Sequence, residues 1–340
     1  MSVIHTLIMP LTGVLSFALA AGMGKLVIPW LHKLKFGQTI LEEGPSWHQK
    51  KSGTPTMGGV LFIGSFAVAL LVAVVLLAVA PGESYFFGTP YESARFWGGI
   101  GLAVGCGLIG FADDFIKVVK KRNLGLTPIQ KLLLQLLVSG GYGVLLYIYG
   151  NGRLNIPFFG EFEWGVWFIP FCMFVVVAMS NATNLTDGVD GLCGTTGFVA
   201  ALALLLLGGL ESQLHQGLIA SALAGGLAGF LVWNLHPARV FMGDTGSLFI
   251  GGALTALAFG IEQPFLLVPV GILYIAENLS VILQVGYFKL THGKRLFKMS
   301  PLHHHFEMCG WSENKIVFVF SAVTLVGCVL AVLLWALTGK

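Results

Sequence analysis

All five aspartates of this 340-residue chain lie at the ends of long apolar segments. Only 10% of the residues are charged, so an acidic side chain beside hydrocarbon needs a compensating reason. Carboxylate oxygens are ligands that Mg²⁺ takes, together with water and substrate phosphates. If the five converge, they form a site that handles Mg²⁺ and phosphate. The five residues are Asp113, Asp114, Asp187, Asp190 and Asp244.

The elements that must position these carboxylates are membrane-spanning helices. The chain is 56% hydrophobic, and its apolar runs reach the roughly 20 residues that cross the hydrocarbon core. We therefore expect an all-α, polytopic integral membrane protein. Residues 1–340 are expected to form a single transmembrane domain, because no polar stretch is long enough to bury a second core. Ten spans are predicted, at 7–30, 58–80, 96–115, 129–149, 164–181, 192–210, 214–233, 246–261, 264–287 and 316–338.

Basic residues predict the orientation of these spans. Fourteen Lys and Arg residues lie in one set of loops, and only Arg95, Arg153 and Lys340 lie in the opposite loops and termini. The positive-inside rule makes the first set cytoplasmic and puts both termini outside. All five aspartates then lie at the cytoplasmic face, where we expect the active site. The net charge of +3 does not indicate a nucleic-acid partner. The cytoplasmic loops are 31–57, 113–128, 182–191, 234–245 and 288–315.

The first motif, GFADDFIK at 110–117, closes the third predicted span. Adjacent residues of a helix point about 100° apart, so we expect Asp113 and Asp114 to have different roles, one facing the site and one a neighbouring element. Lys117 and Lys121 form a basic strip beside them and are candidate substrate contacts. The alternative is a charge cluster that only anchors the helix, although two adjacent acids do not serve positive-inside anchoring.

The second motif, NATNLTDGVDGL at 181–192, joins the fifth and sixth predicted spans. Asp187 and Asp190 share a face if the stretch is helical. Asn181 and Asn184 add neutral amide oxygens. This mixture suits Mg²⁺, a hard cation that prefers oxygen ligands. The alternative is a turn that uses the same residue types without any function.

The third motif, NLHPARVFMGDTGS at 234–247, leads into the eighth predicted span. Asp244 follows a glycine and precedes Thr-Gly-Ser at the start of that span. Backbone N–H groups at such a helix start form an anion cradle. Asn234, at the start of the motif, is a candidate substrate contact. Asp244 as a simple cap of the helix is the alternative, and it is compatible with the first interpretation.

The fourth motif, SPLHHHFE at 300–307, lies in the longest basic loop. Three consecutive histidines cannot all ligate one ion from a regular element, and a structural zinc site would also want Cys partners. Contacts with phosphate or pyrophosphate, or proton handling near neutral pH, fit better. His303, His304 and His305 are therefore candidate catalytic residues.

The fifth motif, KKSGTPTMGG at 50–59, loosely resembles a phosphate-binding loop but is not a Walker A sequence. On its own, this stretch is interpreted as a loop with two exposed lysines.

Together, the five motifs resemble the phospho-N-acetylmuramoyl-pentapeptide transferase family, called MraY, which makes lipid I of peptidoglycan. They appear in family order, so the resemblance covers essentially the whole chain. The aspartate motifs alone indicate only the wider superfamily of polyprenyl-phosphate N-acetylhexosamine-1-phosphate transferases. PLHHHFE and KKSGTPTMGG narrow the resemblance to this one family.

The resemblance implies transfer of phospho-MurNAc-pentapeptide from UDP-MurNAc-pentapeptide to undecaprenyl phosphate, with release of UMP, at the bacterial plasma (inner) membrane. It also implies Mg²⁺ dependence, a homodimer in the lipid bilayer and sensitivity to nucleoside inhibitors. By matching position, Asp244 is the metal ligand, helped by Asn181, and Asp113 and Asp114 are the catalytic pair. The implied contacts to nucleotide, sugar phosphate or inhibitor are Lys51, Thr56, Asn184, Asp187, Asp190, Ser247, Gln284 and His304.

Both substrates of such a reaction are negative where they react. Mg²⁺ at Asp244, with the lysines and histidines of the motifs, would offset that repulsion. Direct attack of the lipid phosphate is favoured, with Asp113 or Asp114 orienting or deprotonating it. A covalent phospho-aspartyl intermediate remains the alternative.

Two other functions compete with this interpretation. A transporter or channel should place ionisable residues near the bilayer midplane, whereas only Glu277 is expected to lie deep. A related transferase that uses UDP-N-acetylglucosamine for another surface polymer is the closer alternative. The ninth span contains Pro269 and Gly271, and we expect it to bend and open a groove for lipid.

Overall fold

The computed structural model describes residues 3–33, 53–80, 88–120 and 124–338. The predicted contacts Lys51 and Lys121 lie outside these described residues. The helices are α1 (Val3–Lys33), α2 (Gly59–Val79), α3 (Pro90–Val119), α4 (Pro128–Gly150), α5 (Phe168–Thr186), α6 (Leu192–Leu210), α7 (Leu214–Asn234), α8 (Gly243–Gly260), α9 (Leu267–Val270), α10 (Ile272–Leu290), α11 (Leu302–Glu307) and α12 (Glu313–Thr338).

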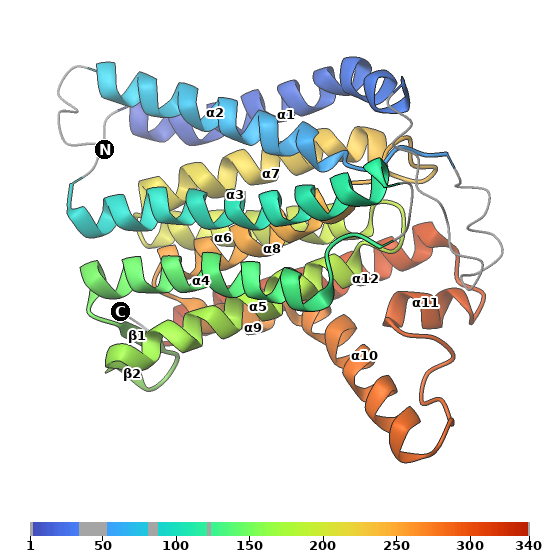
Figure 1. The fold of residues 1–340 in the computed structure, drawn as a ribbon. Coiled ribbons are helices and arrows are strands. Elements are labelled where there is room, and N and C mark those ends of the chain that lie inside the picture. The colour runs from blue at the N-terminus through green and yellow to red at the C-terminus, as the bar shows by residue number, and fades with distance from the viewer. Residues whose placement is uncertain (1–2, 34–52, 81–87, 121–123, 339–340) are drawn as a thin grey trace.

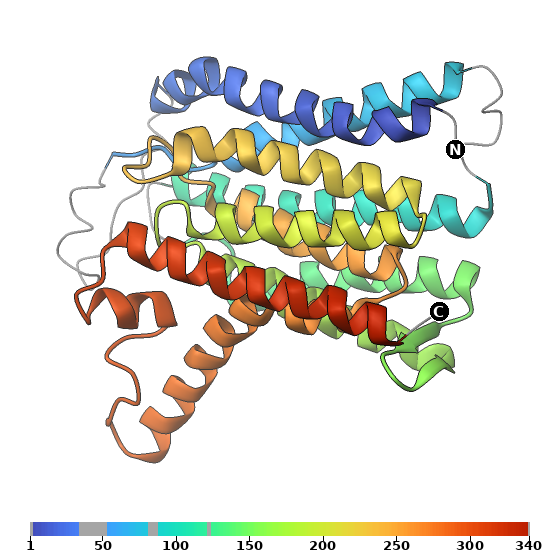
Figure 2. The same ribbon diagram turned by 180° about the vertical axis from the view of Figure 1, so that it is seen from behind.

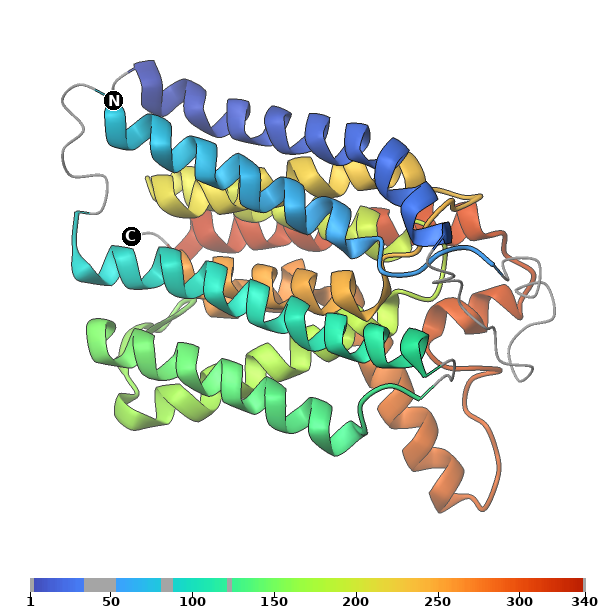
Figure 3. The same ribbon diagram turned by 45° about the horizontal axis from the view of Figure 1, so that its top comes forward.

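The long helices lie side by side in one bundle, and α10 projects away from it (Figures 1 and 2). The start of α1 and the end of α12 lie at the same end of the bundle (Figure 3). The end of α3, the loop before α8 and the short helix α11 lie at the opposite end. The predicted chemical motifs therefore gather at one end of the bundle, away from the two ends of the described chain.

Seven of the described helices are long and apolar enough to cross a membrane, which confirms an all-α polytopic membrane protein. An eighth span is obtained when 264–270 and 272–290, which are bent by 77° at their junction, are counted together. The predicted spans 96–115 and 246–261 correspond to α3 and α8, which do not belong to that set. Helix α8 is buried from Thr245 to Gly260. Because other helices enclose it, little of its surface faces lipid, and its residues need not be as apolar as those of a lipid-facing span.

The expected bend in the ninth span is confirmed. A 3₁₀ turn (Pro264–Leu266) and α9 precede Gly271, and α10 begins at the next residue in a new direction. A proline in a helix removes a backbone hydrogen bond, and Pro269 lies immediately before the break. The sequence therefore indicated both the existence and the place of this bend.

A short antiparallel hairpin between α4 and α5 is the main departure from an all-helical chain. Strand β1 (Arg153–Ile156) pairs with β2 (Gly160–Glu163), and a single 3₁₀ turn (Gly165–Trp167) follows. The sequence analysis did not predict this hairpin, because strands of four residues are too short to show a clear alternation of apolar and polar residues.

Helices α3 and α8 approach each other closely, and this contact positions the site. At Gly110, a Cβ atom would overlap the backbone carbonyl of Asp244. Only glycine permits such an approach, as at other small-residue helix contacts in membranes. The last turns of α3 therefore lie beside the first turn of α8.

Candidate active site

Three of the five aspartates meet where α3 ends and α8 begins. Asp113, Asp114 and Asp244 each offer a carboxylate oxygen, and these oxygens lie within 4.8 Å of one another. Asp113 and Asp114 are buried, and Asp244 is partly exposed. We call these three residues the aspartate cluster. Their convergence is a close grouping of acidic oxygens of the kind that a divalent cation prefers.

Within the cluster, Asp114 caps α8. Its carboxylate accepts hydrogen bonds from the backbone N–H of Asp244 at 3.2 Å and of Thr245 at 2.9 Å, and from the Thr245 hydroxyl at 2.7 Å. The first N–H groups of a helix have no partner inside the helix. Asp114 supplies that partner from a different helix and thereby places Asp244.

Asp113 has different partners. It accepts a hydrogen bond from the Leu126 N–H at 2.8 Å and forms an ion pair with Lys117 at 2.5 Å. Leu126 precedes α4, so this contact draws the start of α4 toward the end of α3. The two adjacent carboxylates thus face different neighbours, in line with the 100° between adjacent helical residues.

Asp244 is held between two lysines. Its Oδ2 lies 2.9 Å from Lys131 Nζ and 3.2 Å from Lys117 Nζ. Burial alone would raise the pKa of the Asp244 carboxyl, but the positive charges of Lys131 and Lys117 hold that pKa below its usual range. Asp244 therefore stays ionised, which suits a ligand of a cation.

Lys131 was missed by the sequence analysis. Helix α4 begins with a capping box, in which Thr127 and Gln130 bond each other's backbone N–H, and Pro128 occupies the first turn. This start places Lys131 in the first turn, at the aspartate cluster. The available signal was a lone lysine inside a predicted apolar span, which is costly unless it is paired.

Asn184 connects the aspartate cluster to α5. Its amide nitrogen donates to Asp244 Oδ1 and to Ser247 Oγ, both at 2.9 Å, and its amide oxygen accepts from Lys131 at 3.1 Å. Asn181, one turn earlier, donates to Gln135 Oε1 at 3.0 Å and to a backbone carbonyl of its own helix at 2.8 Å. Among the described contacts, the neighbour of Asp244 is therefore Asn184, and none joins Asp244 to Asn181.

Asp187 follows α5 directly, on the same side of the bundle as the aspartate cluster. Burial raises the pKa of the Asp187 carboxyl well above its usual range, and the negative charges of Asp244 and Asp114 raise it further. Asp187 is thus electrostatically coupled to the cluster.

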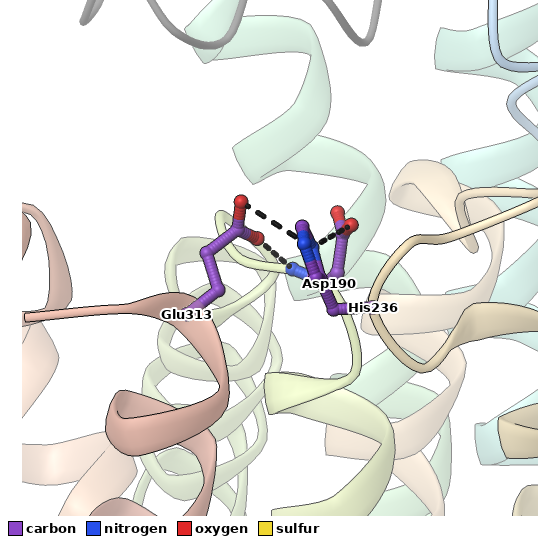
Figure 4. Close-up of side chains that lie close together, drawn as sticks. All are labelled: Asp190, His236 and Glu313. Carbon is purple, nitrogen blue, oxygen red and sulfur yellow. Dashed lines mark hydrogen bonds and ion pairs between the residues drawn. The ribbon is translucent and has the colours of Figure 1, made fainter.

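Asp190 lies in a second group. Asp190 Oδ2 lies 3.0 Å from His236 Nδ1 and accepts a hydrogen bond from the Ala238 N–H at 3.0 Å. A Glu313 carboxylate oxygen lies 3.6 Å from the same His236 nitrogen, and the other accepts a hydrogen bond from the Asp190 N–H at 3.1 Å. Figure 4 shows His236 between the two carboxylates. This group ties the loop before α6, the loop before α8 and the start of α12 together. The sequence analysis singled out neither His236 nor Glu313.

Two predicted substrate contacts hold loops in this structure. Asn234 accepts from the Gly191 N–H at 3.1 Å and donates to the Val240 carbonyl at 2.9 Å. Gln284 accepts from the N–H groups of Leu296 and Phe297, at 3.0 and 2.9 Å, and so secures the loop after α10. Both side chains are buried against the loops that they hold.

The described part of the fifth motif lies directly on the third. The Pro55 carbonyl accepts from the Phe241 N–H at 2.9 Å, and the Gly58 N–H donates to the Phe241 carbonyl at 2.8 Å. The Thr56 hydroxyl lies close to Gly243, where a Cβ atom would meet it. Thr56 is therefore next to the start of α8.

The three histidines lie on α11 and face different partners. His303 Nδ1 lies 3.2 Å from Glu277 of α10, and His304 Nδ1 lies 2.6 Å from Glu307 of its own helix. His305 Nδ1 accepts from the Lys298 N–H at 3.1 Å. Each of these imidazole Nδ1 atoms therefore has a different partner.

One end of this helical membrane bundle carries clustered aspartates and lysines, and the comparisons with known proteins give its class. The family model described as glycosyl transferase family 4 matches residues 96–261. Residues 51–63 match the phospho-N-acetylmuramoyl-pentapeptide-transferase signature 1.

Curated relatives narrow this class. A phospho-N-acetylmuramoyl-pentapeptide-transferase of Clostridium perfringens (strain 13 / Type A) is 46% identical over 319 residues, covering 94% of this chain and 96% of the relative. A protein of the same name from Listeria monocytogenes serotype 4b (strain CLIP80459) is 45% identical over 90% of this chain and 92% of its own length. Another, from Heliobacterium modesticaldum, is 46% identical over 94% of this chain and 96% of its own length. The chain belongs to the phospho-N-acetylmuramoyl-pentapeptide transferase family.

Proposed function

We propose that the aspartate cluster is the place where this family member makes lipid I. Phospho-MurNAc-pentapeptide passes from UDP-MurNAc-pentapeptide to undecaprenyl phosphate, and UMP leaves. The observation that carries the proposal is the meeting of three carboxylates with Lys117 and Lys131 at one end of a membrane bundle. Fixed positive charge next to acidic oxygens suits two anionic substrates that must approach each other.

The proposed orientation puts this end in the cytoplasm. The seven apolar helices, the bent pair, α3 and α8 together make ten spans of a single transmembrane domain. An even number of spans agrees with the start of α1 and the end of α12 lying at one end of the bundle, which is then outside. The basic loops at the aspartate end support this orientation. The membrane is the bacterial plasma (inner) membrane, with the protein as a multi-pass component.

The donor set of the aspartate cluster fits Mg²⁺. Asp244 is the proposed principal ligand because it is ionised and partly exposed. Asn181 is the second ligand that the resemblance implies, and Asn184 is the amide group that contacts Asp244. Lys117 and Lys131 neutralise Asp244 here, and with a cation at Asp244 both lysines would be available to bind phosphate. When bound, Mg²⁺ supplies positive charge for the pyrophosphate of the donor.

Asp113 and Asp114 have different contacts, which support different roles for them. Three hydrogen bonds to α8 occupy Asp114, so it is a positioning residue. Asp113 has one oxygen paired with Lys117, whose long side chain is one-third exposed and can turn to a substrate phosphate. Asp113 is therefore the residue that orients or deprotonates the undecaprenyl phosphate, which attacks the sugar-linked phosphate directly.

The donor substrate lies along the loops around the cluster. Its proposed contacts are Lys51, Thr56, Lys117, Lys121, Asn184, Asp187, Asp190, Asn234, Ser247, Gln284 and His304, with His303 and His305 beside them. Nucleoside inhibitors compete for the same contacts. The acidic and amide side chains suit hydroxyl and N–H groups, and the lysines suit phosphates.

The isoprenoid chain of the acceptor follows α10. This helix leaves the bundle at the 77° bend and exposes Ile282 (59%), Leu283 (52%) and Leu290 (83%). An apolar face beside the bundle lets the lipid tail stay in hydrocarbon while its phosphate reaches the aspartate cluster.

The resemblance also supports a homodimer as the working unit.

A parallel assay of two donors tests this function. Purified protein with undecaprenyl phosphate and Mg²⁺ is given UDP-MurNAc-pentapeptide in one reaction and UDP-N-acetylglucosamine in the other. Lipid-linked product and UMP are expected only with the first donor. A product formed only from the second donor would replace the proposal with the related transferase.

A further inference from the structure

Glu277 is a carboxylate buried inside the bundle. It lies in the second turn of α10, just after the 77° bend, and none of its side chain is exposed. Ionisable residues inside membrane spans are costly and usually have a function. The sequence analysis placed Glu277 deep in the ninth span and assigned it no role.

The partner of Glu277 is His303. Glu277 Oε1 lies 3.2 Å from the backbone nitrogen of His303 and 3.2 Å from its Nδ1. The backbone N–H donates to Oε1, and in the tautomer that carries its proton on Nδ1 the ring donates to the same oxygen and leaves Nε2 as an acceptor. The pair joins α10 to α11 and holds the imidazole in one orientation, as carboxylates do for functional histidines elsewhere.

The other ring nitrogen has no partner. Among the described residues, His303 Nε2 and Glu277 Oε2 are buried without a hydrogen bond, whereas nearly all buried polar atoms are paired. His303 Nε2 lies against Gly188, where any Cβ atom would overlap it. Gly188 lies in the segment 187–190, which carries two proposed donor contacts. The unpaired nitrogen therefore faces the place where the donor substrate is proposed to lie.

We infer that Glu277 is a positioning residue for the donor substrate. By accepting a hydrogen bond from Nδ1–H of His303, it leaves Nε2 as an acceptor for an N–H or O–H group of the uridine or sugar of the donor. Entry of the donor along 187–190 gives Nε2 the partner that it lacks. This inference rests on the proposed function, because it takes the nucleotide sugar as the ligand.

Steady-state kinetics of Glu277 variants test the inference. Glu277→Gln keeps the shape of the side chain and an oxygen that accepts a hydrogen bond from His303 Nδ1–H, whereas Glu277→Leu removes this acceptor. For Glu277→Leu, the KM for UDP-MurNAc-pentapeptide is expected to rise about tenfold or more, with the KM for undecaprenyl phosphate changed less than about twofold. Glu277→Gln is expected to remain within about threefold of the wild type for both substrates.

A double-mutant cycle and a control variant separate positioning from structure. In the His303→Ala background, Glu277→Leu should add less than about a twofold further loss, because its effect passes through that ring. Glu211→Leu is the control: it removes the acceptor of a 2.7 Å hydrogen bond from Trp335 at the other end of the bundle, so it should lower the thermal midpoint without changing either KM.

The outcomes distinguish this inference from the proposed function. Normal lipid I formation by the wild type, with an unchanged donor KM in Glu277→Leu, overturns the inference alone. So does additive loss in the double variant, or a loss in both Glu277 variants that follows only the thermal midpoint. Absence of lipid I formation by the wild type overturns the proposed function itself.

Discussion

The carboxylate of Asp114 holds the start of the helix that carries Asp244. Asp114 accepts the backbone N–H of Asp244 at 3.2 Å, and both residues belong to one group of acidic oxygens. One aspartate therefore sets the position of another across a helix–helix contact. This relationship separates residues that place the site from residues that can act in it.

Removal of the Asp114 cap should destabilise the protein as well as inactivate it. Asp114→Ala leaves two N–H groups and one hydroxyl of α8 without their acceptor, and loss of a helix cap costs about 0.5–2 kcal/mol. We expect a lower thermal midpoint in detergent together with a large loss of lipid I formation. Asp113→Asn, at the adjacent residue, keeps an oxygen for the Leu126 N–H, so it should lose activity and keep a midpoint close to that of the wild type. An unchanged midpoint in Asp114→Ala would contradict the capping role.

Lys131 should be required although it lies in an apolar span. Lys131→Met removes the ammonium group 2.9 Å from Asp244 and the hydrogen bond to Asn184. We expect the turnover rate to fall by roughly 10- to 100-fold, because fixed charge at the reacting phosphates is lost. Lys120→Met is the control, since Lys120 is an exposed lysine at the end of α3. Equal activity of the two variants would remove Lys131 from the site.

Chelation of divalent cations should stop the reaction reversibly. EDTA is expected to abolish UMP release, and added Mg²⁺ should restore it. If Asp244 is the principal ligand, Asp244→Asn should have little activity left and require a higher Mg²⁺ concentration for it, because a carboxylate is replaced by a neutral amide. Titration of UMP release against Mg²⁺ checks this. Full activity in EDTA would exclude the proposed metal.

Asp187 should make the stability of the protein depend on pH. Burial, with Asp244 and Asp114 nearby, raises the pKa of Asp187 in the folded state, so the folded state holds the proton more tightly than the unfolded chain. The stability from this proton is present at low pH and is lost as the pH rises through the folded-state pKa. In EDTA, Asp187→Asn should therefore melt at a higher temperature than the wild type at neutral pH.

The measurement for Asp187 is the thermal midpoint as a function of pH. The difference between Asp187→Asn and the wild type should shrink as the pH falls toward 3.8, the ordinary value for an aspartate. Glu163→Gln, which changes an exposed carboxylate in the hairpin, should follow the wild type throughout. A constant difference at every pH would show that burial does not perturb Asp187.

The sequence predicted the helical membrane architecture and the meeting of Asp113, Asp114 and Asp244, because apolar length, loop charge and motif order are local properties. It predicted different roles for Asp113 and Asp114 but not which was which. That choice depends on how α3 is rotated against α8, and Gly110 fixes the approach of the two helices. No sequence pattern states this rotation.

Other parts of the site depend on contacts between distant segments. Lys131 lies within the predicted apolar span 129–149 and outside the five motifs, so its part in the site was not predicted. His236 and Glu313 are far from Asp190 in the chain, so their grouping could not be foreseen. The hairpin of β1 and β2 was too short to show a periodic pattern. Lys51 and Lys121 lie outside the described residues, so their roles stay predictions.

The most direct test of the central claim measures lipid I and UMP together. Purified wild type, Asp113→Asn and Asp244→Asn are compared with UDP-MurNAc-pentapeptide, undecaprenyl phosphate and Mg²⁺, after their thermal midpoints show that each is folded. The account predicts equal amounts of lipid I and UMP from the wild type, and a rate lower by roughly 100-fold or more in each variant. Wild-type rates in folded Asp113→Asn and Asp244→Asn would contradict it.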